Sequence, residues 1–155
     1  MDDRDTIRTH EAFLEAYETY GEPLFRHCYL RLLDRDLGKE ITQETFKRTW
    51  QHIAEGQEIA NAQLFLYRMA NSLVREARAA HPVPDQIPQE ITGEERSLLD
   101  CIRRLGKEHR DILVMHYIDR FSPPDIASII GLSAETVSLR LSEGMRSMKS
   151  LLSYA

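Results

Sequence analysis

The sequence predicts an all-α protein in which two small helical domains are joined by a flexible acidic linker. No segment alternates apolar and polar residues between turn residues, so strands are not expected. Segment 82–95 interrupts the helical pattern with three of the six prolines, four acidic residues and no basic residue. This composition is typical of an extended, solvated linker. The predicted domains are therefore residues 8–81 and 96–155.

Capping and breaking residues set the predicted helix boundaries. Gly21 ends the first helix, Pro23 begins the second, and Asn61 is the expected cap of the fourth. The spacing from Thr92 to Glu95 predicts a capping box at the start of the second domain. The predicted helices cover about 10–20, 23–33, 37–54, 62–80, 92–105, 107–118, 126–130 and 134–149.

Composition excludes several classes of protein. The 155 residues are 42% hydrophobic, which argues against disorder, and no apolar run approaches the roughly 18 residues of a membrane helix. The acidic start, Met1 to Asp5, is unlike a signal peptide, so a cytoplasmic protein is expected. Cys28 and Cys101 stand outside any metal-ligand run, and no catalytic or phosphate-binding motif is present. Neither a metal, a cofactor nor an enzyme is expected.

The net charge of −5 is unevenly distributed. Residues 1–81 carry 11 basic and 14 acidic side chains, whereas residues 96–155 carry 9 basic and 7 acidic side chains. An acidic total argues against a protein that coats nucleic acid by bulk charge, because backbone binding depends on Lys and Arg. The last 60 residues are mildly basic, so their charge does not argue against DNA binding by this segment.

The second domain contains the spacing of a helix-turn-helix. Ala127 is the small residue that faces the second helix, Gly131 is the turn residue, and Val137 seals the crossing. Ser133 is placed to cap the second helix. An αα-hairpin within any helical bundle is the alternative. The exposed positions expected on the second helix, of which one is basic, are Glu135, Thr136, Ser138, Leu139, Arg140, Ser142 and Glu143.

Two helices of the first domain carry a second pattern. On the helix at 37–54, one side is apolar and the other is a polar stripe containing Glu40, Gln43, Glu44 and Lys47. Such a stripe is most often solvated surface. The helix at 62–80 mixes aromatic and basic residues, as proteins that bind unpaired bases do. Phe65 and Tyr67 are two residues apart, so at least one of them is expected to be exposed, although both remain candidates for the core.

These segments resemble the extracytoplasmic-function (ECF) type of bacterial RNA polymerase sigma factor. YGEPLFRHCYLRLLDRDLGKEITQETFKRTW and NAQLFLYRMANSLVREAR look like the family's second conserved region. LLDCIRRLGKEHRDILVMHYIDRFSPPDIASIIGLSAETVSLRL looks like its fourth conserved region. The resemblance covers about residues 11–152. It implies a subunit that binds core RNA polymerase, through the β′ clamp helices and the β flap, and directs it to promoter DNA.

The resemblance also implies residue roles. Segment 51–63 would be the loop that captures a flipped base of the minus-ten element. The polymerase-binding residues would be Glu40, Gln43, Glu44, Lys47 and Arg48. The residues near the minus-ten element would be Trp50, Asn61, Tyr67, Asn71, Ser72 and Arg75. Those near the minus-thirty-five element would be Arg110, Arg120, Ser133, Glu135, Thr136, Ser138, Leu139 and Arg140.

The recognition helix departs from the family's basic pattern. Ser138, Glu143 and Met145 stand where basic residues are usual. We therefore expect weak unaided promoter binding, and help from a DNA-targeting partner protein; Leu139, Met145 and Met148 are candidates for part of a partner surface. The alternative is a sigma-like decoy or adaptor that binds an anti-sigma factor or polymerase without initiating transcription.

Overall fold

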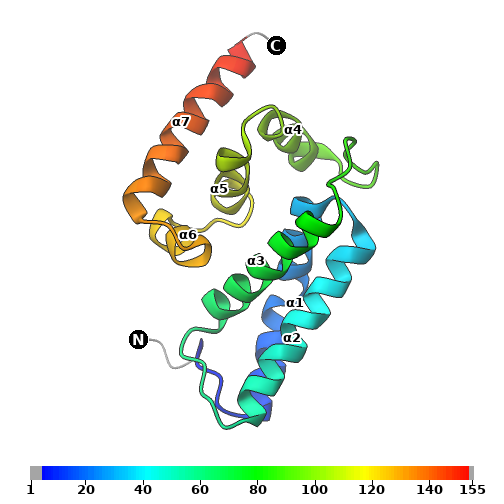
Figure 1. Cartoon of the computed structure of the whole chain (residues 1–155), viewed down its shortest axis with the longest axis vertical. Coiled ribbons are helices and arrows are strands. Elements are labelled where there is room, and N and C mark those ends of the chain that lie inside the picture. Colours follow the sequence, from blue (N-terminus) through cyan, green and yellow to red (C-terminus); the bar gives the residue numbers. More distant parts are fainter. Residues whose placement is uncertain (1–4, 154–155) are drawn as a thin grey trace. The chain divides into compact units, whose positions relative to one another are not determined.

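The computed structural model describes residues 5–153, and the side chains of all of these except 107, 108, 152 and 153. Within this part the chain forms seven α-helices and no named strand, which confirms the all-α class (Figure 1). The chain divides into two compact units, 1–83 and 84–155. The acidic start at residues 1–4 lies outside the described residues.

Helix α1 (His10–Leu32) is one continuous helix where the sequence predicted two. Neither Gly21 nor Pro23 breaks it. An internal proline costs about 3 kcal/mol because it removes a backbone hydrogen bond and crowds the preceding turn. Ala16 before the proline and Leu24 after it are both buried in the core of the first unit. Packing of both halves of the helix therefore outweighs the local preference for a break.

Helices α2 (Arg35–Ala54) and α3 (Ala62–Ala80) complete the first unit. The side chain of Asn61 accepts a hydrogen bond from the backbone N–H of Leu64 at 3.1 Å, which confirms the predicted cap of α3. Both helices pack against α1 (Figure 1).

The segment before α1 is tied to the loop between α2 and α3. Ile7 and Ile59 form an antiparallel bridge with N–O distances of 2.8 and 3.1 Å, and both side chains are buried. The Tyr20 hydroxyl donates to Asp5 at 2.7 Å. Burial and this hydrogen bond raise the pKa of Tyr20 above its usual value, which keeps the phenol protonated. The segment before α1 thus holds the loop at Ile59.

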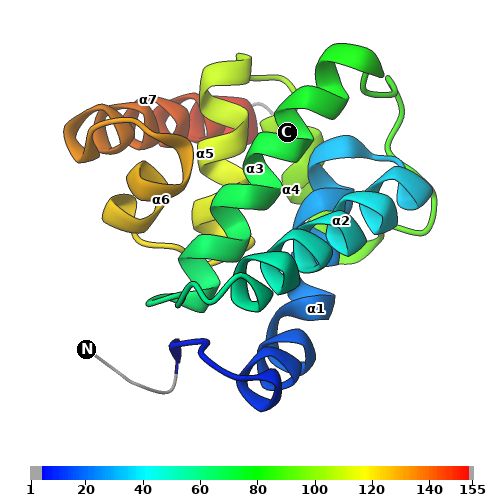
Figure 2. The ribbon, with the colours of Figure 1, turned by 60° about the horizontal axis from the view of Figure 1, so that its bottom comes forward.

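The second unit consists of α4 (Gly93–Ile102), α5 (Lys107–Tyr117), α6 (Pro123–Ile130) and α7 (Ala134–Ser153). Helix α6 lies against the first turns of α7 (Figure 2). The predicted capping box is wrong, because the Thr92 side chain makes no capping hydrogen bond. Helix α7 continues beyond its predicted end.

Part of the predicted linker folds onto the second unit. Ile87 and Ile91 are buried, and the Arg96 guanidinium donates to the carbonyl oxygens of Pro88 at 2.9 Å and Ile91 at 3.1 Å. The prediction of a solvated chain is therefore wrong for this part of 82–95. Isoleucines spaced four apart were the signal in the sequence that the proline and acidic content obscured.

Gly144 allows α5 and α7 to approach closely. A Cβ atom at this position would lie 2.9 Å from the Leu113 Cδ1 atom, and Leu113 is fully buried. Gly144→Ala gains about 1 kcal/mol of helix propensity but overpacks the interface by about 1–3 kcal/mol. We expect the variant to lower the free energy of unfolding of the second unit by about 1 kcal/mol in urea titration. Ser142→Ala, at an exposed position of the same helix, is the control, and a stabilised Gly144→Ala would contradict the close packing.

Candidate nucleic-acid interface

The predicted helix-turn-helix is present in the second unit. Ala127 is buried against α7, and Val137 is completely buried at the crossing of the two helices. Gly131 adopts a φ of 83°, in the left-handed region that glycine tolerates best, and its N–H donates to the Ala127 carbonyl at 2.8 Å. Ile129 takes a core position, whereas Ile130 is half-buried. The three residues that carry the motif have the predicted roles.

Ser133 sets the start of α7, the candidate recognition helix. Its hydroxyl accepts from the Thr136 backbone N–H at 3.1 Å and lies 2.7 Å from the Thr136 hydroxyl. The buried side of α7 contains Val137 and Leu141. The predicted outward positions are exposed or half-buried, namely Glu135, Thr136, Ser138, Leu139, Arg140, Ser142 and Glu143.

Arg110 and Arg120 differ in their availability to phosphates. Arg110 Nε donates to the Leu105 carbonyl at 2.6 Å, and its Nη2 donates to the Arg103 carbonyl at 2.7 Å. Arg110 therefore caps the end of α4 in this structure, and its predicted phosphate contact stays a prediction. Arg120 is exposed, with a φ of 66° in the turn before α6.

The polar stripe of α2 forms an exposed surface of the first unit. Glu40, Gln43, Lys47 and Arg48 are exposed, and Glu44 is half-buried. Arg48 Nε donates to Glu44 Oε1 at 2.9 Å. This hydrogen bond lowers the pKa of Glu44, so the carboxylate stays ionised. The stripe thus presents fixed charges of both signs.

The opposite side of α2 is anchored in the core. Thr42, Thr45 and Thr49 are buried, and each hydroxyl donates to the carbonyl four residues earlier at 2.7–2.8 Å. Buried threonines that satisfy their own hydroxyls in this way need no partner on another helix. They fix which face of α2 points outward.

Two of the predicted minus-ten residues are buried in the first unit. Asn71 is 4% exposed, and its Oδ1 accepts from the buried Arg31 Nη1 at 2.9 Å. Tyr67 is 3% exposed and lies edge-on to the His27 ring. In this structure both side chains belong to the core of the first unit and neither reaches the surface, and their predicted contact with a DNA strand stays a prediction.

Trp50 and Asn61 also have structural contacts. Trp50 is half-buried, with its ring 4.1 Å from that of His10. Asn61 is exposed but its side chain caps α3. Phe65 is half-buried against His52, so the expectation that Phe65 or Tyr67 is exposed is wrong.

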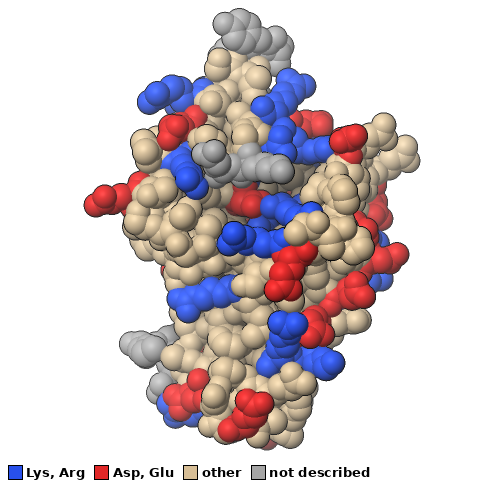
Figure 3. Space-filling view, in the orientation of Figure 1, with Lys and Arg blue, Asp and Glu red and all other residues tan. Residues whose placement is uncertain are grey.

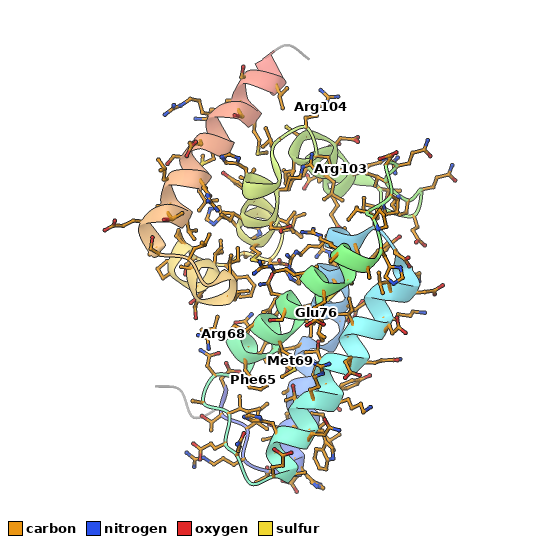
Figure 4. The ribbon with its side chains drawn as sticks, in the orientation of Figure 1. Phe65, Arg68, Met69, Glu76, Arg103 and Arg104 are labelled. Carbon is orange, nitrogen blue, oxygen red and sulfur yellow. The ribbon has the colours of Figure 1, made fainter. Side chains whose placement is uncertain are left out.

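The exposed side of α3 carries two arginines and the acidic Glu76, and it includes a basic residue that the sequence analysis missed. Ser72 and Arg75 are exposed as predicted, and Arg68 is exposed one turn before Ser72. Figure 4 shows Arg68 beside Phe65 and Met69 on this helix. The spacing of four and three residues from Arg68 to Ser72 to Arg75 was the available signal. A stripe of this kind suits the backbone of an unpaired strand.

Charges of both signs are mixed on the face of the described chain that Figure 3 shows, where Lys and Arg are interspersed with Asp and Glu. In the described part of the chain, no group of three or more His, Cys, Asp and Glu residues is placed to hold a metal ion. Across the same residues, no helix has the length and hydropathy needed to cross a membrane. Cys28 and Cys101 are both buried.

The chain is similar to known transcription factors in sequence. Residues 95–148 match the family model "Sigma-70, region 4". The "Probable RNA polymerase sigma factor RfaY" of Xanthomonas campestris pv. campestris is 28% identical over an alignment of 134 residues that covers 74% of this chain and 34% of that protein. The "ECF RNA polymerase sigma factor SigL" of Mycobacterium tuberculosis is 27% identical over an alignment of 149 residues that covers 86% of this chain and 84% of that protein. The chain thus spans about a third of the first relative's length and most of the second's.

Solved structures share the fold. The structure of CnrH in complex with the cytosolic domain of CnrY matches with a TM-score of 0.73 and 18% identity, over 94% of this chain and 90% of that one. The sigma factor RpoE in complex with the anti-sigma factor NepR, from Bartonella quintana, matches with a TM-score of 0.71 and 16% identity, over 92% and 98%.

The helix-turn-helix lies within the residues that match the sigma-70 region 4 family. Sequence similarity over most of the chain is to RNA polymerase sigma factors, and the relatives SigL and SigW are named as ECF sigma factors. Proteins of this family are regulatory rather than catalytic.

Proposed function

We propose that this chain docks on core RNA polymerase through the polar stripe of α2 and depends on its partners for promoter binding. The observation that carries the proposal is the contrast between two surfaces. The stripe of α2 is exposed and keeps the residues that the family resemblance assigns to polymerase. Helix α7, by contrast, sets Glu135 and Glu143 against few basic side chains. Docking is thus better supported than unaided DNA binding.

The two units have separate roles at the promoter. In the first unit, the exposed Arg68, Ser72 and Arg75 of α3 follow the backbone of the opened minus-ten strand. In the second unit, α7 enters the major groove of the minus-thirty-five element, with Ser138 and Arg140 near base edges and phosphates. Polymerase supplies most of the non-specific affinity, so an acidic subunit with net charge −5 is compatible with this function. The work of such a subunit is cytoplasmic, where core polymerase acts.

An anti-sigma factor or a DNA-targeting protein is the further partner that we propose. The structurally similar RpoE is found in complex with an anti-sigma factor. The acidic side chains of α7 weaken its attraction to phosphates, so a second protein would strengthen DNA binding. The decoy or adaptor function remains the second candidate, because Glu143 is exposed on the recognition helix and would repel phosphates.

Transcription from a promoter library with core polymerase and no other factor tests the proposal. Weak but promoter-specific initiation is the expected result. Strong specific initiation would remove the need for a targeting partner. Polymerase binding without any initiation would favour the decoy, and the absence of polymerase binding would refute docking altogether.

Gln43→Ala tests the docking surface directly. Gln43 is exposed on the stripe and has no role in the core, so the variant should fold normally. We expect its affinity for core polymerase to fall about tenfold, the equivalent of about 1.4 kcal/mol, in a competition assay. Glu18→Ala, at an exposed position of α1, is the matched control. Wild-type affinity for Gln43→Ala would place the docking surface elsewhere.

A further inference from the structure

Leu139 is the large apolar side chain that the recognition helix leaves in solvent within its first turns. It is 60% exposed, and it follows the cap at Ser133 by six residues. The residues beside it, Ser138 and Arg140, are polar. A leucine in solvent forgoes the favourable free energy of burying its apolar surface, whereas a serine or lysine has little such free energy to lose. Its place on the recognition helix is therefore informative.

The helix geometry points Leu139 directly away from the second unit. At about 100° per residue, Leu139 lies roughly 200° around the helix from the buried Val137. Glu135, Ser142 and Arg146, which are all exposed, share this outermost side. In a helix-turn-helix the outermost side of the second helix enters the major groove, and residues of its first turns meet base edges.

The other exposed apolar residue of α7 does not join Leu139 in one patch. Met145 is 39% exposed, but it lies roughly 120° away around the helix. Met148 is half-buried on the inner side. A docking surface for a protein partner would need contiguous apolar area. A single apolar side chain among serines and an arginine can instead contact a single methyl group on an otherwise polar surface.

We infer that Leu139 contacts the C5-methyl group of a thymine in the minus-thirty-five element and so determines the base preferred there. Thymine is the base that presents a methyl group in the major groove, and apolar side chains recognise it. The inference rests on the proposed function, since it requires α7 to lie in that groove. It adds base specificity at one exposed position of α7.

Deoxyuridine tests the inference because it lacks only the methyl group of thymine. Promoters are first selected from a library with core polymerase and the full chain. Each thymine of the minus-thirty-five element is then replaced singly by deoxyuridine. We expect initiation to fall about fourfold at one position, which corresponds to about 0.8 kcal/mol for one buried methyl group. Leu139→Ala holoenzyme should be insensitive at that position, and Met145→Ala holoenzyme should keep the fourfold effect.

Each contrary outcome has its own meaning. Initiation that is equally strong with deoxyuridine at every position overturns the inference and leaves the proposed function intact. The absence of specific initiation from the whole library refutes the proposed function and the inference together. If Leu139→Ala weakens binding of an anti-sigma factor while deoxyuridine has no effect, Leu139 belongs to a protein interface and the inference fails.

Discussion

Asn71→Ala is expected to lower the free energy of unfolding of the first unit by about 2–3 kcal/mol. Asn71 Oδ1 accepts from the guanidinium of Arg31, and both side chains are buried. Hydrogen bonds to charged groups contribute about 1.5–3 kcal/mol, and a truncated side chain adds a small cavity. Urea titration of the full chain, followed by a probe in the first unit, measures the loss.

Two further variants separate this structural role from contact with DNA. Asn71→Asp keeps an acceptor oxygen for Arg31 and should recover most of the stability. Ser72→Ala changes the neighbouring exposed side chain and should alter stability by less than about 0.5 kcal/mol. If Asn71→Ala unfolds like the wild type but opens promoters poorly, Asn71 acts on DNA and its burial is not what matters.

Val137→Ala is expected to cost about 2–3 kcal/mol in the second unit, because it removes two methyl groups and leaves a cavity between α6 and α7. Val137 is completely buried where the two helices cross. The crossing positions α7, so the variant should also lose its preference for promoters with an intact minus-thirty-five element. Thermal unfolding and transcription from paired promoters measure the two effects.

Ser138→Ala is the matched control for Val137→Ala. It replaces the next residue on the exposed side of α7, and its effect on stability should stay within about 0.5 kcal/mol. A Val137→Ala protein with wild-type stability would show that the packing of α6 on α7 does not hold the motif together.

The elements that local signals define were predictable from the sequence. Helix α3 has its predicted bounds, since Asn61 caps its start and Pro82 follows its end. The helix-turn-helix was predictable for the same reason, because Ala127, Gly131 and Val137 act within eleven consecutive residues. Helix α1 was not, because the burial of residues on both sides of Pro23 depends on the other helices.

The parts of the candidate site that depend only on which helix face is exposed were predictable from the sequence. The stripe on α2 and the outward side of α7 follow from helical periodicity. The structural contacts that the sequence did not reveal join side chains to partners that are distant in sequence or belong to the backbone. Arg31 is 40 residues from Asn71, and no periodicity of α3 reveals it. The acceptors of Arg110 are carbonyls at the end of another helix, which residue types do not encode.

The bridge between Ile7 and Ile59 has a thermodynamic consequence for the loop between α2 and α3. A loop that is held in place before it meets its ligand loses little conformational entropy on binding. In this chain the loop is ordered during folding by the segment before α1, which is distant in sequence. Within that segment, Ile7 pairs with Ile59 and Asp5 accepts a hydrogen bond from Tyr20. Under the proposed function, the affinity of the first unit for an opened promoter strand would therefore be linked to the integrity of a segment that itself needs no contact with DNA.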